Sequence, residues 1–160
     1  MNYLLNQTRR AFTFIEVAVV IIIIGILAAM VVPKFSSVTD DAKAASVQGT
    51  LGGVRAAIAG FRTSALLSSK PPFPTLVELN TLGTVLQQPV PANPFTNQTA
   101  VQIVSALAAA NRTTSNESSY GWNYFVDNSS TPPTAIFYAN STATTTVKNA
   151  AGAFLTANKL

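Results

Sequence analysis

A single carboxylate stands inside a long apolar stretch near the beginning of this 160-residue chain. The stretch runs from Phe12 to Val32, and within it only Thr13, Glu16 and Gly25 interrupt the apolar residues. An ionised carboxylate is costly in apolar surroundings unless a cation pairs with it. Glu16 therefore predicts a positively charged partner, and the stretch itself contains no Lys or Arg.

Cleavage of the peptide bond between Ala11 and Phe12 supplies such a partner. The new α-amino group of Phe12 is positively charged near neutral pH and lies four residues before Glu16. Residues four apart share one face of a helix, so the pair can form within one chain. A pair between neighbouring chains is more useful, because it fixes the axial register of helices that otherwise slide past one another.

The apolar stretch is also long enough to cross a membrane. As a helix, its residues span about 31 Å, which matches the hydrocarbon core of a bilayer. Arg9 and Arg10 stand just before it, so the positive-inside rule places residues 1–11 in the cytoplasm and the rest outside. A secretory signal peptide and a permanent anchor are the alternatives. The first lacks a small-residue cleavage site before Pro33, and the second leaves Glu16 unpaired.

The segment "RRAFTFIEVAVVIIIIGILAAMVVP" resembles the N-terminus of type IV pilins and of type II secretion pseudopilins. The matching features are a short basic leader, Phe12, Thr13, Glu16, the apolar run, Gly25 and Pro33. The resemblance implies that a prepilin peptidase removes residues 1–11 and methylates the new amine of Phe12. It also implies that Glu16 guides each subunit into a helical filament. One departure is Ala11, which stands where the family usually has glycine.

The same resemblance implies a location and a set of partners. The chain is expected in the bacterial inner membrane as a single-pass protein with a periplasmic or extracellular head, and later in a periplasmic or cell-surface filament. Its expected partners are copies of itself, prepilin peptidase, the inner-membrane assembly platform, other pseudopilins and, before assembly, membrane lipid. Nucleic acid is not an expected partner, because no basic patch with interleaved aromatic residues follows Arg10.

The element that must hold Glu16 is predicted to be one long helix from about residue 12 to 67. Residues 12–32 form its transmembrane or filament-core part, and residues 33–67 form an amphipathic continuation. Its stripe of apolar residues, spaced four and three apart, should pack on a head; it comprises Val47, Leu51, Val54, Ile58 and Phe61. A second stripe is made of Phe35, Val38, Ala42 and Ala45. Pro33 and Gly25 are predicted to kink or soften the helix.

Residues 68–160 are predicted to form a loop and a small head. Thr75 and Glu78 have the spacing of a capping box at the start of a short helix. The segments "YGWNYFVD" and "TAIFYAN" predict a hairpin with Trp122 in the core, and Thr144–Lys148 predicts a further strand. The first part of "AVQIVSALAAANRTTSNESS" fits a strand or a short helix, and the second part is a polar loop. The fold class is thus α+β, with a long helix packed on a small antiparallel sheet, as in type IV pilins.

Catalysis by the head is not expected. The chain has no Cys and no His, and the acids Glu78, Glu117 and Asp127 are far apart in sequence. No cofactor is expected, with one qualification that the resemblance supplies. Major pseudopilins commonly bind calcium in a late loop, where Asp127 and Asn128 offer oxygen ligands here. The alternative role of these two residues is to form a turn.

The predicted function is that of a structural filament subunit, most like a major pseudopilin acting in protein export. The segments "FPTLVEL", "PANPF" and "GWNY" favour this choice, because they are similar to pseudopilin head segments. Two alternatives stay open. One is a type IV pilin for adhesion, motility or DNA uptake. The other is an uncleaved bitopic protein whose head binds a ligand or partner.

Overall fold

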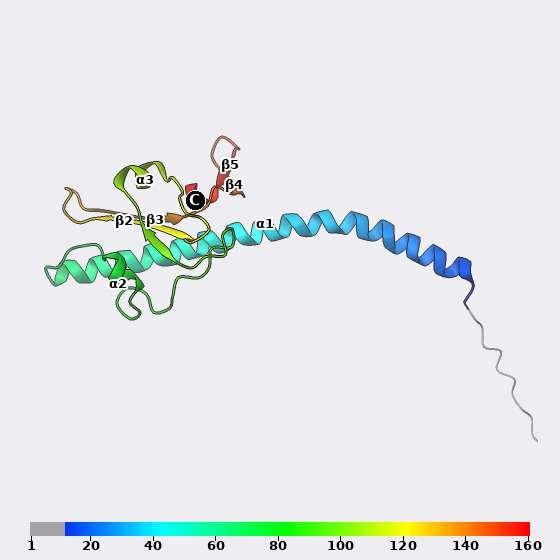
Figure 1. Cartoon of the computed structure of the whole chain (residues 1–160), viewed down its shortest axis with the longest axis horizontal. Coiled ribbons are helices and arrows are strands. Elements are labelled where there is room, and N and C mark those ends of the chain that lie inside the picture. The colour runs from blue at the N-terminus through cyan, green and yellow to red at the C-terminus, as the bar shows by residue number, and fades with distance from the viewer. Residues whose placement is uncertain (1–11) are drawn as a thin grey trace, which may run out of the picture. The chain divides into compact units, whose positions relative to one another are not determined.

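In the computed structural model, residues 12–160 are described, the side chains of residues 32–37 excepted. The chain divides into two units, one ending at Val38 and one running from Thr39 to Leu160. Helix α1, Phe14–Leu67, belongs to both (Figure 1). The predicted continuation of the helix beyond Pro33 is therefore confirmed.

A local backbone motif ends α1. Ser69 adopts the left-handed conformation with φ 53°, although it is not glycine. The N–H of Lys70 then donates to the carbonyl of Ala65 at 2.9 Å, and the N–H of Ser69 donates to that of Leu66 at 3.4 Å. This is a Schellman ending, which satisfies carbonyls that the last turn leaves free. Two prolines follow directly and prevent the helix from resuming.

The head contains a three-stranded sheet of order β1-β2-β3, with β1 at Val101–Ile103, β2 at Trp122–Asp127 and β3 at Thr134–Ala139. The predicted hairpin is β2–β3, antiparallel from Trp122 opposite Ala139 to Asp127 opposite Thr134. Strand β1 instead pairs parallel with β2, so the sheet is mixed. The reason is the connection, since parallel neighbours need a long crossover and this one contains helix α3, Ala106–Asn111.

One face of this sheet packs on the second half of α1. Of the predicted apolar stripe, Val47, Leu51, Val54 and Ile58 are buried, with at most 6% of each residue exposed, while Phe61 is half-buried. The four buried residues meet Trp122, Tyr124 and Phe137 in one core cluster. The rings of Trp122 and Phe137 stack with centroids 5.6 Å apart. Trp122 is fully buried, which confirms its predicted place in the core.

Polar atoms on the core aromatics bind two proline-rich loops. The hydroxyl of Tyr124 donates to the carbonyl of Pro74 at 2.7 Å, and the indole N–H of Trp122 donates to that of Pro91 at 2.9 Å. Just after Pro74, Thr75 caps helix α2, Leu76–Asn80, and forms the predicted capping box with Glu78. Two loops far apart from the hairpin in sequence are thereby fixed to it.

The opposite face of the sheet is covered by α3 and the loop that follows it. Tyr138 on this face donates to the carbonyls of Ala108 and Thr113. Beyond β3 the chain adds a second sheet of two strands, β4 at Thr144–Lys148 and β5 at Phe154–Thr156. It ends in a short 3-10 helix, η1, Ala157–Lys159, whose Asn158 side chain donates to the carbonyl of Arg112 at the end of α3. The predicted strand at Thr144–Lys148 is confirmed.

Candidate functional site

The first part of α1 presents apolar side chains in every direction. From Phe14 to Val31 the helix is long and apolar enough to cross a membrane, and none of that window is buried. Phe14 is 90% exposed and Ile15 is 67% exposed. A helix that is apolar all round is stable only where something else surrounds it, either lipid or other helices. This segment, Phe14–Val31, is called the apolar helix below.

The structure places Glu16 in the first turn of the apolar helix, where it forms a capping box with Thr13. The hydroxyl of Thr13 accepts a hydrogen bond from the backbone N–H of Glu16 at 3.3 Å. In return the Glu16 carboxylate accepts from the backbone N–H and the hydroxyl of Thr13, both at 3.3 Å. The carboxylate thus satisfies a free N–H at the helix start and lies at the positive end of the helix dipole.

Sequence reasoning missed this capping box, although the signal is visible as Thr-x-x-Glu before an apolar run. The box has a consequence for the proposed cleavage point. Because the helix begins at Phe14, Phe12 and Thr13 precede it, and Phe12 is 81% exposed. Ala11 and the rest of the predicted leader, residues 1–11, lie outside the described residues.

The two predicted kink residues both fall within α1. An added Cβ at Gly25 meets no atom within 4 Å. Pro33 is part of the helical backbone, and its side chain lies outside the described part of the structure. A functional kink or soft zone at these two residues stays a prediction.

The second predicted apolar stripe differs from the first in its exposure to solvent. Val38, Ala42 and Ala45 are exposed, and the side chain of Phe35 lies outside the described residues. Ala44 is buried. Within the unit that begins at Thr39, burial along α1 therefore starts at about Ala44, later than the start of the predicted amphipathic segment at residue 33. The exposed stripe is free to contact another molecule.

The calcium candidates Asp127 and Asn128 both have structural hydrogen bonds. Asp127 accepts from the hydroxyl of Ser129 at 2.6 Å and from its backbone N–H at 2.8 Å, and these bonds lower the pKa of Asp127. Asn128 binds both the N–H and the carbonyl of Phe73, at 3.0 and 2.8 Å. These hydrogen bonds agree with the alternative role of the two residues, which is to form a turn. Calcium binding by the pair stays a prediction.

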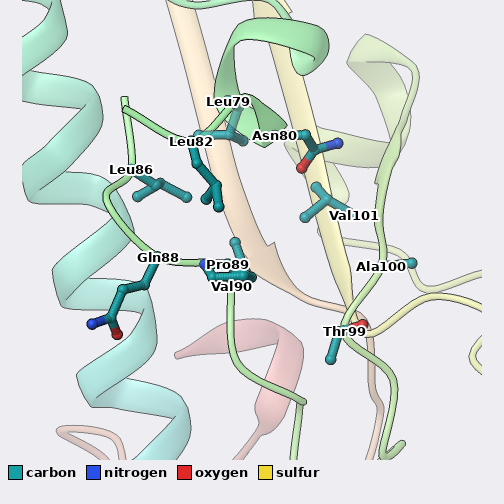
Figure 2. A pocket seen from close by; sticks show the side chains of 10 residues that line it. All are labelled: Leu79, Asn80, Leu82, Leu86, Gln88, Pro89, Val90, Thr99, Ala100 and Val101. Atoms are coloured by element: carbon teal, nitrogen blue, oxygen red, sulfur yellow. The ribbon is translucent and has the colours of Figure 1, made fainter. Parts of the chain in front are cut away.

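Acidic residues do not gather elsewhere in the described part of the chain. Among residues 12–160, no three Asp, Glu, His or Cys side chains form a group able to hold a metal ion. A hollow of about 240 Å³ lies between α2 and β1. Figure 2 shows that it is lined mainly by apolar side chains such as Leu79, Leu86 and Val101, with no ionisable group among them. Its residues offer no nucleophile paired with a base.

The head holds a buried network of asparagines that periodicity did not predict. Asn123 and Asn140 have no exposed surface, and their side chains bond to each other at 3.1 Å. Asn140 also donates to the carbonyls of Ser115 and Tyr120, while Asn123 accepts from Gln102 at 2.7 Å. No buried side-chain polar atom in the described residues lacks a partner. The buried polar side chains of the head therefore all have hydrogen-bond partners within the chain. The apolar side chains of the apolar helix, by contrast, are exposed.

Comparison with known proteins matches the N-terminal segment specifically. Residues 6–32 match the family described as the prokaryotic N-terminal methylation motif. The chain is 52% identical over 50 residues to the type IV narrow pilus major component PilA5 of Thermus thermophilus. It is 47% identical over 53 residues to type II secretion system core protein G of Pseudomonas aeruginosa.

These matches cover 31% and 33% of this chain, and 43% and 37% of the two relatives. They therefore span less than half of either relative. No solved structure matches the chain significantly. The motif, both relatives and the arrangement of the elements agree with the predicted resemblance. The N-terminal segment of this chain is thus similar to that of type IV pilin-like proteins, and it carries the N-terminal methylation motif on an apolar helix that leads into a small α+β head.

Proposed function

We propose that this chain is a structural subunit of a helical filament, made as a precursor in the inner membrane. Prepilin peptidase cuts it between Ala11 and Phe12 and methylates the amine of Phe12. The observation that carries the proposal is the apolar helix, which exposes its apolar side chains in all directions and needs lipid or other helices around it. Copies of the same helix meet that need without a second kind of protein.

The capping box gives Glu16 a role both before and after the cut. In the uncut chain its carboxylate is directed at the helix start, where it accepts from Thr13. The amine of Phe12 forms one residue before Thr13, so the cut places a positive charge beside a carboxylate that already faces this end. An ion pair there lowers the cost of burying Glu16 among apolar helices. The amine of a neighbouring copy satisfies the same requirement and also sets the register between chains.

Within this class we propose a type II secretion pseudopilin that acts in protein export with other pseudopilins and an inner-membrane assembly platform. Support comes from the three head segments on which the sequence prediction rested. Tyr124 and Trp122 bind the carbonyls of Pro74 and Pro91, so "FPTLVEL", "PANPF" and "GWNY" form one connected unit. A surface pilus subunit is the second candidate, favoured by the 52% identity to a narrow pilus component.

The test is expression of the full chain in a host with a prepilin peptidase and a type II secretion system that lacks its own major pseudopilin. We expect a mature chain that begins at N-methylated Phe12, sedimentable filaments and restored export of the host's secreted enzymes. Long surface filaments without restored export favour the pilus subunit. A chain that keeps residues 1–11 and never sediments contradicts both.

A further inference from the structure

A cationic hollow lies between α1 and the outer strand β3. Its volume is about 290 Å³, and its lining includes the guanidinium-bearing Arg55, Arg62 and Arg112 together with Phe73 and Ile136. No carboxylate side chain lines it. Three like charges around one small space repel each other, and its apolar walls reduce the screening that water provides. The hollow is therefore a concentration of positive charge on the surface of the head.

The three arginines are held in place by contacts that leave some of their guanidinium N–H groups without an acceptor among the described residues. Arg55 donates to the carbonyl of Phe137 at 3.0 Å and to the backbone oxygen of Leu160 at 3.2 Å. Arg112 donates to the same Leu160 oxygen at 2.6 Å. The guanidinium of Arg62 stacks 5.1 Å from the ring centre of Phe73. Burial, and then the charge of Arg112, lower the pKa of Arg55. A guanidinium has five donors, so an arriving carboxylate still finds free N–H groups.

The acids of the described chain are divided between those with internal partners and those without. Glu16, Glu78 and Asp127 accept hydrogen bonds from neighbours in sequence, and Glu117 accepts one from Thr142. Asp40 and Asp41 are exposed on α1, and within the described residues neither carboxylate has a side-chain hydrogen bond or ion pair. Both lie in the same unit as the hollow. These two carboxylates and the cationic hollow are complementary in charge.

We propose that the cationic hollow of one subunit receives the Asp40–Asp41 pair of a second copy of this chain. The two sites cannot meet within one molecule. Asp41 and Arg62 lie 21 residues apart on the same helix, a separation of about 32 Å along its axis. The exposed stripe of Val38, Ala42 and Ala45 flanks the acids, so apolar contact accompanies the ion pairs. This inference rests on the proposed filament.

The proposal predicts how far contacting copies are displaced from each other along the filament axis. If parallel helices contact through these charges, the offset between the two copies equals the distance between the sites along α1. That offset is about 22 Å for Asp40 with Arg55 and about 32 Å for Asp41 with Arg62. Contacting copies are therefore expected to be displaced by roughly 20–30 Å along the filament axis.

Disulfide trapping tests the contact directly, because the chain has no cysteine of its own. The full chain carrying Asp41→Cys and Arg62→Cys is assembled into filaments and oxidised. A disulfide needs Cα atoms within about 7 Å, so the distance within one chain excludes an internal bridge. We expect a ladder of covalent multimers. The matched control pairs Asp41→Cys with Lys148→Cys, exposed on β4, and should stay monomeric.

A charge exchange tests the chemistry of the contact independently of cysteine. Arg62→Asp and Asp41→Arg should each reduce the sedimentable fraction, and the two together should restore it. Intact mass showing loss of residues 1–11 confirms that every variant is processed. The proposal stands only if the ladder and the restoration are both seen.

A failure of this inference can be distinguished from a failure of the proposed filament. Normal wild-type filaments without the ladder overturn this inference alone and leave the filament intact. A ladder without restoration means that the sites are close but not matched by charge, which also overturns it. If the wild-type chain forms no filament in the presence of the assembly machinery, the proposed function and this inference fall together.

Discussion

The apolar helix and the head differ in whether the chain itself buries their apolar side chains. The head has its own core, where Trp122 and Tyr124 are fully buried and every buried side-chain polar atom of the described residues has a partner. The apolar helix buries almost nothing, and Phe14 and Ile15 are mostly exposed. One region is complete as a single chain, and the other needs an environment that the single chain does not provide.

Because of this contrast, a charged side chain has a different effect in each of the two regions. Glu16 is the only charged residue of the apolar helix, so its partner decides whether the helix can be buried. In the head, two of the carboxylates are held by near neighbours in sequence, Glu78 by Thr75 and Asp127 by Ser129. Changes in the head should therefore affect its stability, whereas changes in the apolar helix should affect assembly and leave head stability unaltered.

The largest effect on stability is expected at Gly121. A Cβ at this position lies 1.9 Å from the backbone oxygen of Gln98, so the loop carrying Gln98 must move. Gly121→Ala should lower the free energy of unfolding of the head by about 3 kcal/mol. Denaturant titration of the full chain in detergent checks this, with fluorescence of Trp122, the single tryptophan, as the probe.

The matched control is Gly52→Ala on the exposed side of α1, where an added Cβ meets no atom within 4 Å. Because alanine is the better helix former, this change should stabilise by about 0.5–1 kcal/mol. Equal effects of the two substitutions would contradict the close approach at Gly121.

The asparagine network should give the next largest effect. Asn140→Ala removes the partner of the Ser115 N–H and of the carbonyls of Ser115 and Tyr120. Leaving such buried groups unpaired costs about 2–3 kcal/mol in the free energy of unfolding. The same fluorescence titration measures it. Asn111→Ala, on the exposed end of α3, should change stability by less than about 0.5 kcal/mol, and a comparable loss there would argue against a special role for the network.

A smaller, pH-dependent effect is expected at the capping box of α2. The backbone N–H of Thr75, and then its hydroxyl, lower the pKa of Glu78. A lowered carboxyl pKa adds stability above the unfolded pKa, and this is lost as the pH falls through the folded value. Thr75→Val should cost about 1 kcal/mol at neutral pH. The difference between variant and wild type should shrink in acid, and a constant difference across the titration would contradict this role of Glu78.

The smallest effect on the head should come from the apolar helix. Ile22→Asn introduces a polar side chain at a position that is 60% exposed and does not belong to the core cluster of the head. We expect the unfolding of the head to change by less than about 0.5 kcal/mol, while the sedimentable fraction of the protein falls sharply. A destabilised head would mean that the two regions are not independent.

The sequence predicted the features that depend on local chemistry or on a clear period. Helix α1, the Thr75–Glu78 capping box, the β2–β3 hairpin and the burial of Trp122 belong to this class. Each arises from residues close together or from an apolar stripe, so a short window of sequence contains the whole signal. The methylation motif is similarly local.

Features that depend on contacts across long distances were not predicted. The parallel pairing of β1 depends on a crossover that contains α3, and nothing in residues 101–103 alone indicates it. Asn123 and Asn140 are buried because the loop after α3 covers them, which the alternation of residues in β2 does not indicate. The cationic hollow joins arginines from α1 and from the end of α3.

The central claim is that the apolar helix is built to be buried against copies of itself, with Glu16 paired to an amine. Glu16→Gln tests it most directly, because glutamine keeps the capping hydrogen bonds with Thr13 and removes only the charge. Thr13→Val is the complementary variant, which keeps the charge and removes the cap. The measurement is the sedimentable filament fraction of the processed chain. We expect Glu16→Gln to be cut before Phe12 yet to lose filaments, and Thr13→Val to retain them. Wild-type assembly by Glu16→Gln would contradict the account.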